Sequence, residues 1–227
     1  MKNYILHGEN RVESRKKLSE LIREAKGKGW EVTKVDGTSL TRGGLLTHSR
    51  SQSLLSTGQL LVIENFFKNN KKAAEEVLEI QYDDAIMLVF WEGKTLTPAT
   101  VRKLQTKFTV QEFKIPVAVF KFLDSLAPNN ARASLRLLAD AKNRDEAEFL
   151  LIMIARQVRL LIWAKEDPDT LKLPPWMKNN LTRQAEKFTR SELRALHNKL
   201  LELDRDNKHS RLPESLEASL ELLVAGL

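Results

Sequence analysis

Cysteine is absent from this 227-residue sequence, which excludes disulfide bonds and thiolate metal sites. No apolar run approaches the roughly 20 residues of a membrane-spanning helix. The first ten residues, MKNYILHGEN, also lack the apolar core of a signal peptide. From these absences we expect a cytoplasmic protein that does not associate with membranes.

Metal-binding and hydrolase motifs are also missing. The histidines His7, His48, His197 and His209 show no ligand spacing such as HExxH, and no GxSxG motif or Ser/His/Asp set stands out. We therefore interpret the four histidines as isolated surface residues. We expect no metal site and no catalytic residues.

A phosphate-binding loop is missing at the position where a strand–turn–helix pattern would normally hold one. The stretch YILHGENRVESRKKL reads as a strand, a turn and a helix, and a working loop there would follow the pattern GxxxxGK[ST]. Gly8 is present, but the residues after it, Val12 and Glu13 among them, do not complete the pattern. Later in the chain, Glu64-Asn65 resembles a metal-holding acidic pair with only one acid, and we interpret it as a solvated strand end. The chain alone is therefore predicted to be neither an enzyme nor an ATP-binding protein, and to need no cofactor.

The charge is moderately basic, with a net value of +7 and a pI near 9.5. A basic excess favours contact with a polyanion such as DNA, although many small proteins are basic for no specific reason. Basic residues crowd the first expected helix, where the alternative is a solvated face balanced by Glu13, Glu20 and Glu24. The candidate DNA-binding residues are Arg11, Arg15, Lys16, Lys17 and Arg23.

The first half of the chain alternates short apolar runs with helical patterns. Runs that are apolar throughout and separated by helices predict a parallel sheet covered on both faces. The expected strands are Asn3–Leu6, Glu31–Val35, Leu60–Ile63, Ala85–Trp91 and Val110–Phe113. The expected helices are Glu13–Lys26, Leu45–Ser56, Lys71–Ile80 and one that begins at Thr97-Pro98.

The second half contains helical patterns and no convincing strand, so the fold class is α/β followed by all-α. We place the boundary near Lys114–Pro116, which gives domains of residues 1–115 and 116–227. Residues 149–154 are apolar all round and predict a central buried helix. Its Arg156 and Arg159 would face one way and pair with acids of a neighbouring subunit or of the bundle itself. Trp163 and Trp176 are predicted to anchor the core.

One stretch of the first half, SQSLLSTGQLLVIENFF, holds two adjacent leucines, Leu54 and Leu55. On a helix through Leu45, Leu46 and this pair, the four leucines spread round the whole circumference. Either one of the pair is exposed, as in a protein-binding tip, or Gly58 ends the helix and both leucines cap the core. Periodicity leaves both alternatives open.

Five stretches follow one another along nearly the whole chain. They are YILHGEN, SLLSTGQLLVIEN, MLVFWEGK, VFKFLDSLAPNNARASLRLL and the run from ARQVRLLIWAK to LTRQAEKFTRSELRALHNKLLELDRDNK. Together these stretches resemble the delta subunit of the bacterial DNA polymerase III clamp loader. The resemblance implies an AAA+-like first domain without ATPase activity and a helical collar domain that assembles with other loader subunits. It implies that Ser53, Leu54 and Leu55 bind the sliding clamp and favour its open form, with Leu55 in place of the common aromatic residue.

The resemblance also implies primer-template DNA as a partner within the complex, and Arg156 and Arg159 as candidates for the collar interface. The small lid domain of the family has no room here, because FTVQEFK runs almost directly into IPVAVFKFLDSL. Two alternative functions stay open. One is a nucleotide-dependent enzyme with an atypical phosphate site, and the other is a basic DNA-binding adaptor unrelated to the clamp.

Overall fold

The computed structural model describes residues 2–48, 57–67, 72–80, 85–142 and 147–227. The chain divides into two compact units, residues 1–115 and 116–227. Within the described ranges, no helix is long and apolar enough to cross a membrane.

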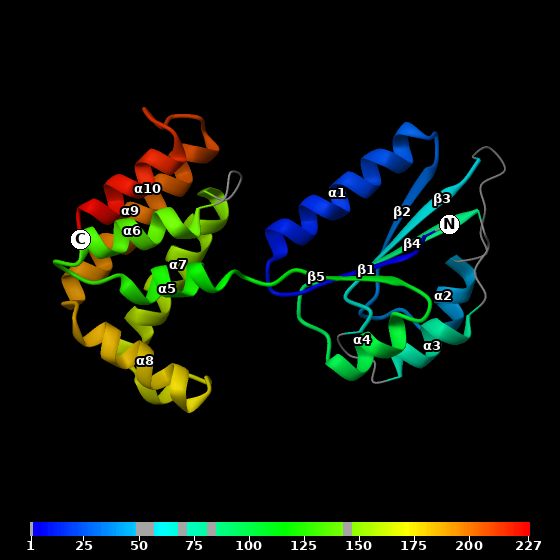
Figure 1. Cartoon of the computed structure of the whole chain (residues 1–227), viewed down its shortest axis with the longest axis horizontal. Coiled ribbons are helices and arrows are strands. Elements are labelled where there is room, and N and C mark those ends of the chain that lie inside the picture. The colour runs from blue at the N-terminus through cyan, green and yellow to red at the C-terminus, as the bar shows by residue number, and fades with distance from the viewer. Residues whose placement is uncertain (1, 49–56, 68–71, 81–84, 143–146) are drawn as a thin grey trace. The chain divides into compact units, whose positions relative to one another are not determined.

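The first unit is built on one parallel five-stranded sheet in the order β2-β3-β4-β1-β5 (Figure 1). The strands are β1 (Tyr4–His7), β2 (Glu31–Asp36), β3 (Gln59–Glu64), β4 (Ile86–Glu92) and β5 (Thr109–Glu112). The helices are α1 (Arg11–Gly27), α2 (Arg42–His48), α3 (Ala73–Glu79) and α4 (Pro98–Leu104).

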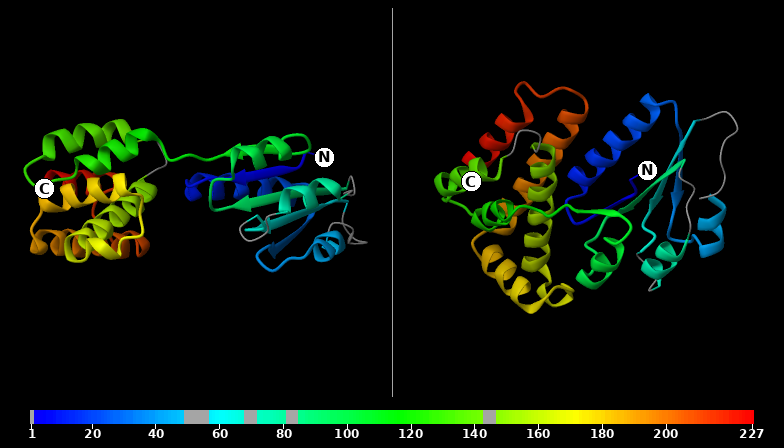
Figure 2. Two further views of the ribbon diagram at one scale, coloured as in Figure 1. Left: turned by 90° about the horizontal axis from the view of Figure 1, so that it is seen from below. Right: turned by 45° about the vertical axis from the view of Figure 1, so that its right-hand side comes forward.

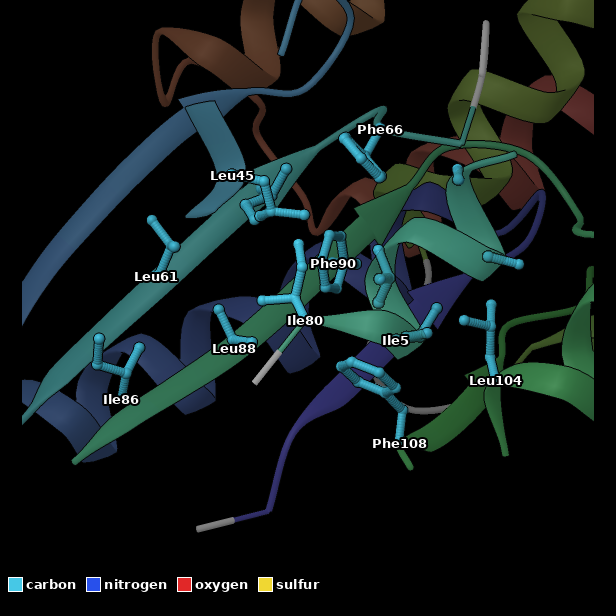
Figure 3. Packing of buried hydrophobic residues seen from close by; sticks show 14 residues of the cluster. Ile5, Leu45, Leu61, Phe66, Ile80, Ile86, Leu88, Phe90, Leu104 and Phe108 are labelled. Carbon is cyan, nitrogen blue, oxygen red and sulfur yellow. The ribbon is translucent and has the colours of Figure 1, made fainter. Parts of the chain in front are cut away.

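Helices cover both faces of this sheet. Neighbouring residues of a strand point to opposite faces, so a strand that is apolar throughout has side chains to bury on each face. Leu60 and Val62 of β3 pack with α1 on one face. Leu61 and Ile63 of the same strand pack on the other face, against side chains from α2, α3 and α4. In Figure 3 the second cluster gathers around Phe90 of β4. The predicted parallel sheet domain with helices on both faces is confirmed.

The second unit is helical throughout its described residues, which confirms the predicted all-α half (Figure 2). Its elements are α5 (Val117–Ser125), α6 (Ala131–Ala141), α7 (Ala147–Glu166), the 3₁₀ turn η1 (Pro168–Thr170), α8 (Pro175–Glu186), α9 (Arg190–Lys208) and α10 (Leu216–Ala225).

A buried amide pair ties three of these helices together. Gln157 of α7 donates from Nε2 to Oε1 of Gln184 on α8 at 2.7 Å. Gln184 in turn donates to the carbonyl oxygens of Leu123 and Leu126 at the end of α5, at 2.8 and 2.9 Å. These bonds give buried carbonyl groups at the end of a helix a hydrogen-bond donor.

Three interpretations of apolar and histidine residues are wrong. Helix α7 is not buried all round, because Ile152 is 54% exposed. Trp163 and Trp176 are 47% and 67% exposed, so neither is a core anchor. An apolar residue type does not require burial, since much of any protein surface is apolar. His7 is buried instead of lying on the surface, because it ends β1, an interior strand that pairs with β4 and β5.

Candidate functional site

The loop between β1 and α1 lies at the carboxyl edge of the sheet, where parallel α/β proteins bind ligands. In a phosphate-binding loop, the backbone N–H groups point at the anion. Here the N–H of Gly8 donates to the carbonyl oxygen of Lys94 at 3.2 Å, and that of Asn10 donates to the carbonyl oxygen of Phe113 at 3.0 Å. The N–H of Glu13 donates to Oδ1 of Asn10 at 3.1 Å. Oxygen atoms of the chain itself therefore take the place of an anion at these three groups.

Gly8 allows the segment after β5 to lie against this loop. Its φ is +134°, a conformation that side chains with a Cβ rarely adopt. A Cβ at this position would lie 2.2 Å from the carbonyl oxygen of Phe113. Asn10 then caps α1 through its side chain, which explains why the helix starts at Arg11 instead of the expected Glu13.

Next to the loop, Arg15 of α1 holds the carboxylate at the end of β3. Its Nη1 and Nη2 atoms lie 2.5 and 2.6 Å from the two carboxylate oxygens of Glu64. The guanidinium carbon also lies 3.6 Å from the ring centroid of Trp91 on β4. The hydrogen bonds from Arg15 lower the pKa of Glu64 below its ordinary value. The interpretation of Glu64 as a solvated strand end is therefore wrong, because its side chain is only 23% exposed and is bound by Arg15.

His7 lies at the same edge and is buried. Its Nδ1 accepts a hydrogen bond from the backbone N–H of Leu96 at 3.3 Å, so the neutral ring carries its proton on Nε2. That Nε2 atom has no hydrogen-bond partner among the described residues. Burial lowers the pKa of His7, and the charge of Glu112 opposes this in part. Burial therefore favours the neutral form of the imidazole.

A cavity of about 350 Å³ opens beside these groups, where β3 and β4 end. Arg11, Lys94 and the buried Glu92 line it together with hydroxyl groups of the loop before α4. Glu92 accepts a hydrogen bond from the backbone N–H of Phe67 at 2.9 Å, and Arg11 donates through Nε to the carbonyl oxygen of Gly93 at 3.2 Å. The cavity therefore combines both signs of charge. Within the described residues, no group of three or more acidic and histidine side chains is arranged to hold a metal ion.

The five candidate DNA-binding residues all lie on or at the start of α1, but they do not form one surface. Arg15 faces the sheet and is bound to Glu64, and Lys17 pairs with Glu20 at 3.2 Å. Lys16 and Arg23 are exposed and share a helical face, because they are seven residues apart. DNA binding by Arg11, Arg15, Lys16, Lys17 and Arg23 stays a prediction.

The predicted clamp-binding residues Ser53, Leu54 and Leu55 lie outside the described residues. Before them in the chain, α2 ends at His48; after them, β3 begins at Gln59 and lies between β2 and β4. Leu45 of α2 is fully buried, whereas Leu46 is only partly buried. The prediction for the leucine pair is untested.

Arg156 and Arg159 are both exposed on α7. Neither forms an ion pair with any residue that the structure describes, so the interpretation that they pair within the bundle is not supported. Arg156 instead lines an apolar groove between α5, α7 and α8, a feature that the sequence pattern did not reveal. The sequence did contain one signal for this part of the groove. Trp176 directly follows two prolines, and a proline at the first helical position fixes where α8 begins.

Comparisons with known proteins identify the second unit. Residues 117–227 match the family model described as the C-terminal domain of the DNA polymerase III delta subunit. A comparison with curated proteins gives no match.

Among solved structures, the DNA clamp loader delta protein of Bacillus subtilis is 13% identical, with a TM-score of 0.48 over 99% of this chain and 94% of that one. A DNA polymerase III gamma subunit-related protein of Thermotoga maritima is 14% identical, with a TM-score of 0.36 over 100% and 88% of the two chains. The Holliday junction branch migration motor RuvB of Thermotoga maritima is 15% identical, with a TM-score of 0.36 over 98% and 74%. At these identities and scores, the structural likenesses assign neither a function nor a partner.

Proposed function

Because residues 117–227 belong to the family of the C-terminal domain of the DNA polymerase III delta subunit, we propose that the chain is a delta-like subunit of a clamp loader in DNA replication. This family membership is the observation that carries the proposal. In the proposed assembly the second unit is the collar that joins other loader subunits. The complex acts on primer-template DNA in the cytoplasm.

The first unit of this protein binds the sliding clamp through Ser53, Leu54 and Leu55. Burying two leucine side chains in an apolar pocket contributes roughly 3–6 kcal/mol before the costs of association. To open the clamp, the protein must bind the open form more tightly than the closed form, since equal affinity shifts nothing. Rigid β3, which follows the leucine pair in the chain, supports such a role because its residues 60–63 are fully buried.

The geometry of the β1–α1 loop supports a loader protein that does not bind ATP. Two N–H groups of the loop and one of the first turn of α1 already donate to oxygen atoms of the chain, and Glu64 is held by Arg15. A nucleotide phosphate would have to displace the carbonyl group of Phe113, which packs on Gly8. These contacts favour the loader protein over a nucleotide-dependent enzyme.

The proposal is tested by the affinity of the full chain for the sliding clamp, measured by calorimetry. We expect a Leu54→Ala/Leu55→Ala variant to lose most of this affinity. A matched control is Leu201→Ala/Leu222→Ala, which removes two leucines that are each 61% exposed in the second unit. Equal clamp affinity in the wild type and in a folded Leu54/Leu55 variant would refute the assignment of these residues, and no clamp affinity in the wild type would refute the function.

A further inference from the structure

The second unit carries an apolar groove of about 230 Å³ between α5, α7 and α8. We call it the aromatic groove and define it by Phe120, Leu123, Met153, Leu160, Trp176 and Met177. An apolar cavity of about 150 Å³ is large enough to bind a benzene ring. The aromatic groove can therefore take one leucine or aromatic side chain.

Two aromatic side chains of the groove are presented to solvent. Phe120 is 38% exposed and Trp176 is 67% exposed. Trp176 is fixed at the start of α8 by Pro174 at the N-cap and Pro175 at the first helical position. A rigid aromatic residue loses little conformational entropy on binding, which is why such residues anchor interfaces.

A stripe of exposed residues on α7 continues from the groove. It consists of Ile152, Arg156, Arg159 and Trp163, which we call the α7 stripe. Their spacing of four, three and four residues puts them on one helical face over about 16 Å. The indole N–H of Trp163 donates to Oγ1 of Thr170 at 2.7 Å, so this ring is also held in place.

The two arginines of this surface lack an ion-pair partner among the residues that the structure describes. Arg156 and Arg159 form no ion pair with them, although exposed acids are common elsewhere in the unit. An exposed arginine next to an apolar groove is typical of surfaces that bind carboxylates with geometric specificity. Asp124 also lines the groove, and no hydrogen bond joins its side chain to another described residue.

We propose that the aromatic groove and the α7 stripe together bind an acidic amphipathic helix of a partner protein. One large apolar side chain of that helix enters the groove beside Trp176, and carboxylates of the same helix pair with Arg156 and Arg159. Apolar groups at the helix ends contact Ile152 and Trp163. This inference rests on the proposed function only in that the second unit joins other proteins, and it names the chemistry of one partner surface.

The test is a selection of peptides on the full chain. Random peptides about 16 residues long, enough for a helix of roughly 24 Å, are displayed on phage. We expect the enriched sequences to combine large apolar residues at helical spacing with Asp or Glu. Their affinity, measured by fluorescence anisotropy, should fall at least about tenfold in Trp176→Ala and in Arg156→Glu/Arg159→Glu.

The matched control is Arg194→Glu/Lys199→Glu, which reverses two exposed charges on α9. It should bind the selected peptides as the wild type does. Since Trp176, Arg156 and Arg159 are exposed, all variants should keep the wild-type thermal midpoint. The absence of any enriched peptide, a basic consensus, or equal affinity in the groove variants would each overturn the proposal.

A second copy of the chain is another occupant that the test detects. If sedimentation velocity shows a dimer that Trp176→Ala dissociates, the groove binds a second copy of the chain and the proposal is wrong.

The clamp experiment addresses Leu54 and Leu55 in the first unit, whereas the peptide selection addresses the second unit. Either can therefore fail while the other succeeds.

Discussion

The contact between Arg15 and Glu64 gives the sharpest test of how the first unit is held together. It joins residues 49 apart in sequence through two hydrogen bonds, and Arg15 also stacks on Trp91. Its side chains are 42% and 23% exposed, so it lies between a surface ion pair and a buried one. A surface pair contributes about 0.2–1 kcal/mol, and a hydrogen bond to a charged group about 1.5–3 kcal/mol. After discounting for exposure, we expect a coupling energy of about 1–2 kcal/mol.

A double-mutant cycle with Arg15→Ala, Glu64→Ala and the combined variant measures this energy. Arg15→Ala should cost about 0.5–1 kcal/mol more than the coupling alone, because it also removes the cation–π contact with Trp91. Urea unfolding is followed by fluorescence in a background where the two exposed tryptophans of the second unit are replaced by phenylalanine. The remaining signals come from Trp30 and Trp91, both in the first unit.

The matched control is the pair Lys17–Glu20 on the same helix, three residues apart and partly exposed to solvent. Pairs of this kind contribute about 0.2–0.5 kcal/mol. The pKa of Glu64 is lowered in the folded state, so its contribution to stability is complete above the unfolded value near 4.5 and disappears as the pH falls through the lowered pKa. A coupling no larger than that of Lys17–Glu20, or one that persists undiminished at about pH 2, would refute the reasoning.

Three further predictions concern single residues. Burial lowers the pKa of His7, so the unfolded chain binds more protons than the folded one below about pH 6.5. The free energy of unfolding should therefore decrease as the pH falls from about 7 to 5. His7→Asn should flatten this dependence in urea titrations, whereas the same change at exposed His209 should not. Gly8→Ala should lower the free energy of unfolding by about 2 kcal/mol or more, because of the clash with Phe113 and the positive φ. Gly27→Ala, where nothing lies within 4 Å of the new Cβ, should be neutral or slightly stabilising, and a similar loss at both glycines would contradict the argument. Asp124→Asn should slightly raise the thermal midpoint at about pH 7. Partial burial raises the pKa of Asp124, so the charged carboxylate destabilises the folded state above that pKa. A lower midpoint would show that the carboxylate has an attractive partner instead.

The sheet was predictable because β1, β3 and β4 are short apolar runs, and β2 and β5 carry valines between polar residues. In β4, every side chain is buried, so the pattern indicates a strand that is covered on both faces. The five strands and their parallel arrangement could therefore be predicted from the sequence. The start of α1 was missed by two residues, although Asn10 is a preferred N-cap residue and was the available signal.

Contacts between distant segments were not predictable. Nothing in the local pattern indicates that Arg15 reaches Glu64, because this depends on how α1 crosses β3. The exposed positions of Trp163 and Trp176 could not be read from residue type either. A helix that is apolar over six residues can still expose one face where its neighbours end, as Ile152 does.

At the carboxyl edge of the sheet, the first unit is held together by contacts within the chain. The loop N–H groups of Gly8 and Asn10 are bound to segments that follow β4 and β5, and Arg15 binds the end of β3. Polar groups at this edge are thus bonded to the segments that follow neighbouring strands. These contacts join β1, β3, β4 and β5 without a ligand, so the sheet needs no bound nucleotide to hold its edge together. On the proposed function, this leaves the unit as a constant support for its clamp-binding tip, and any nucleotide-driven change must come from the partner proteins of the loader.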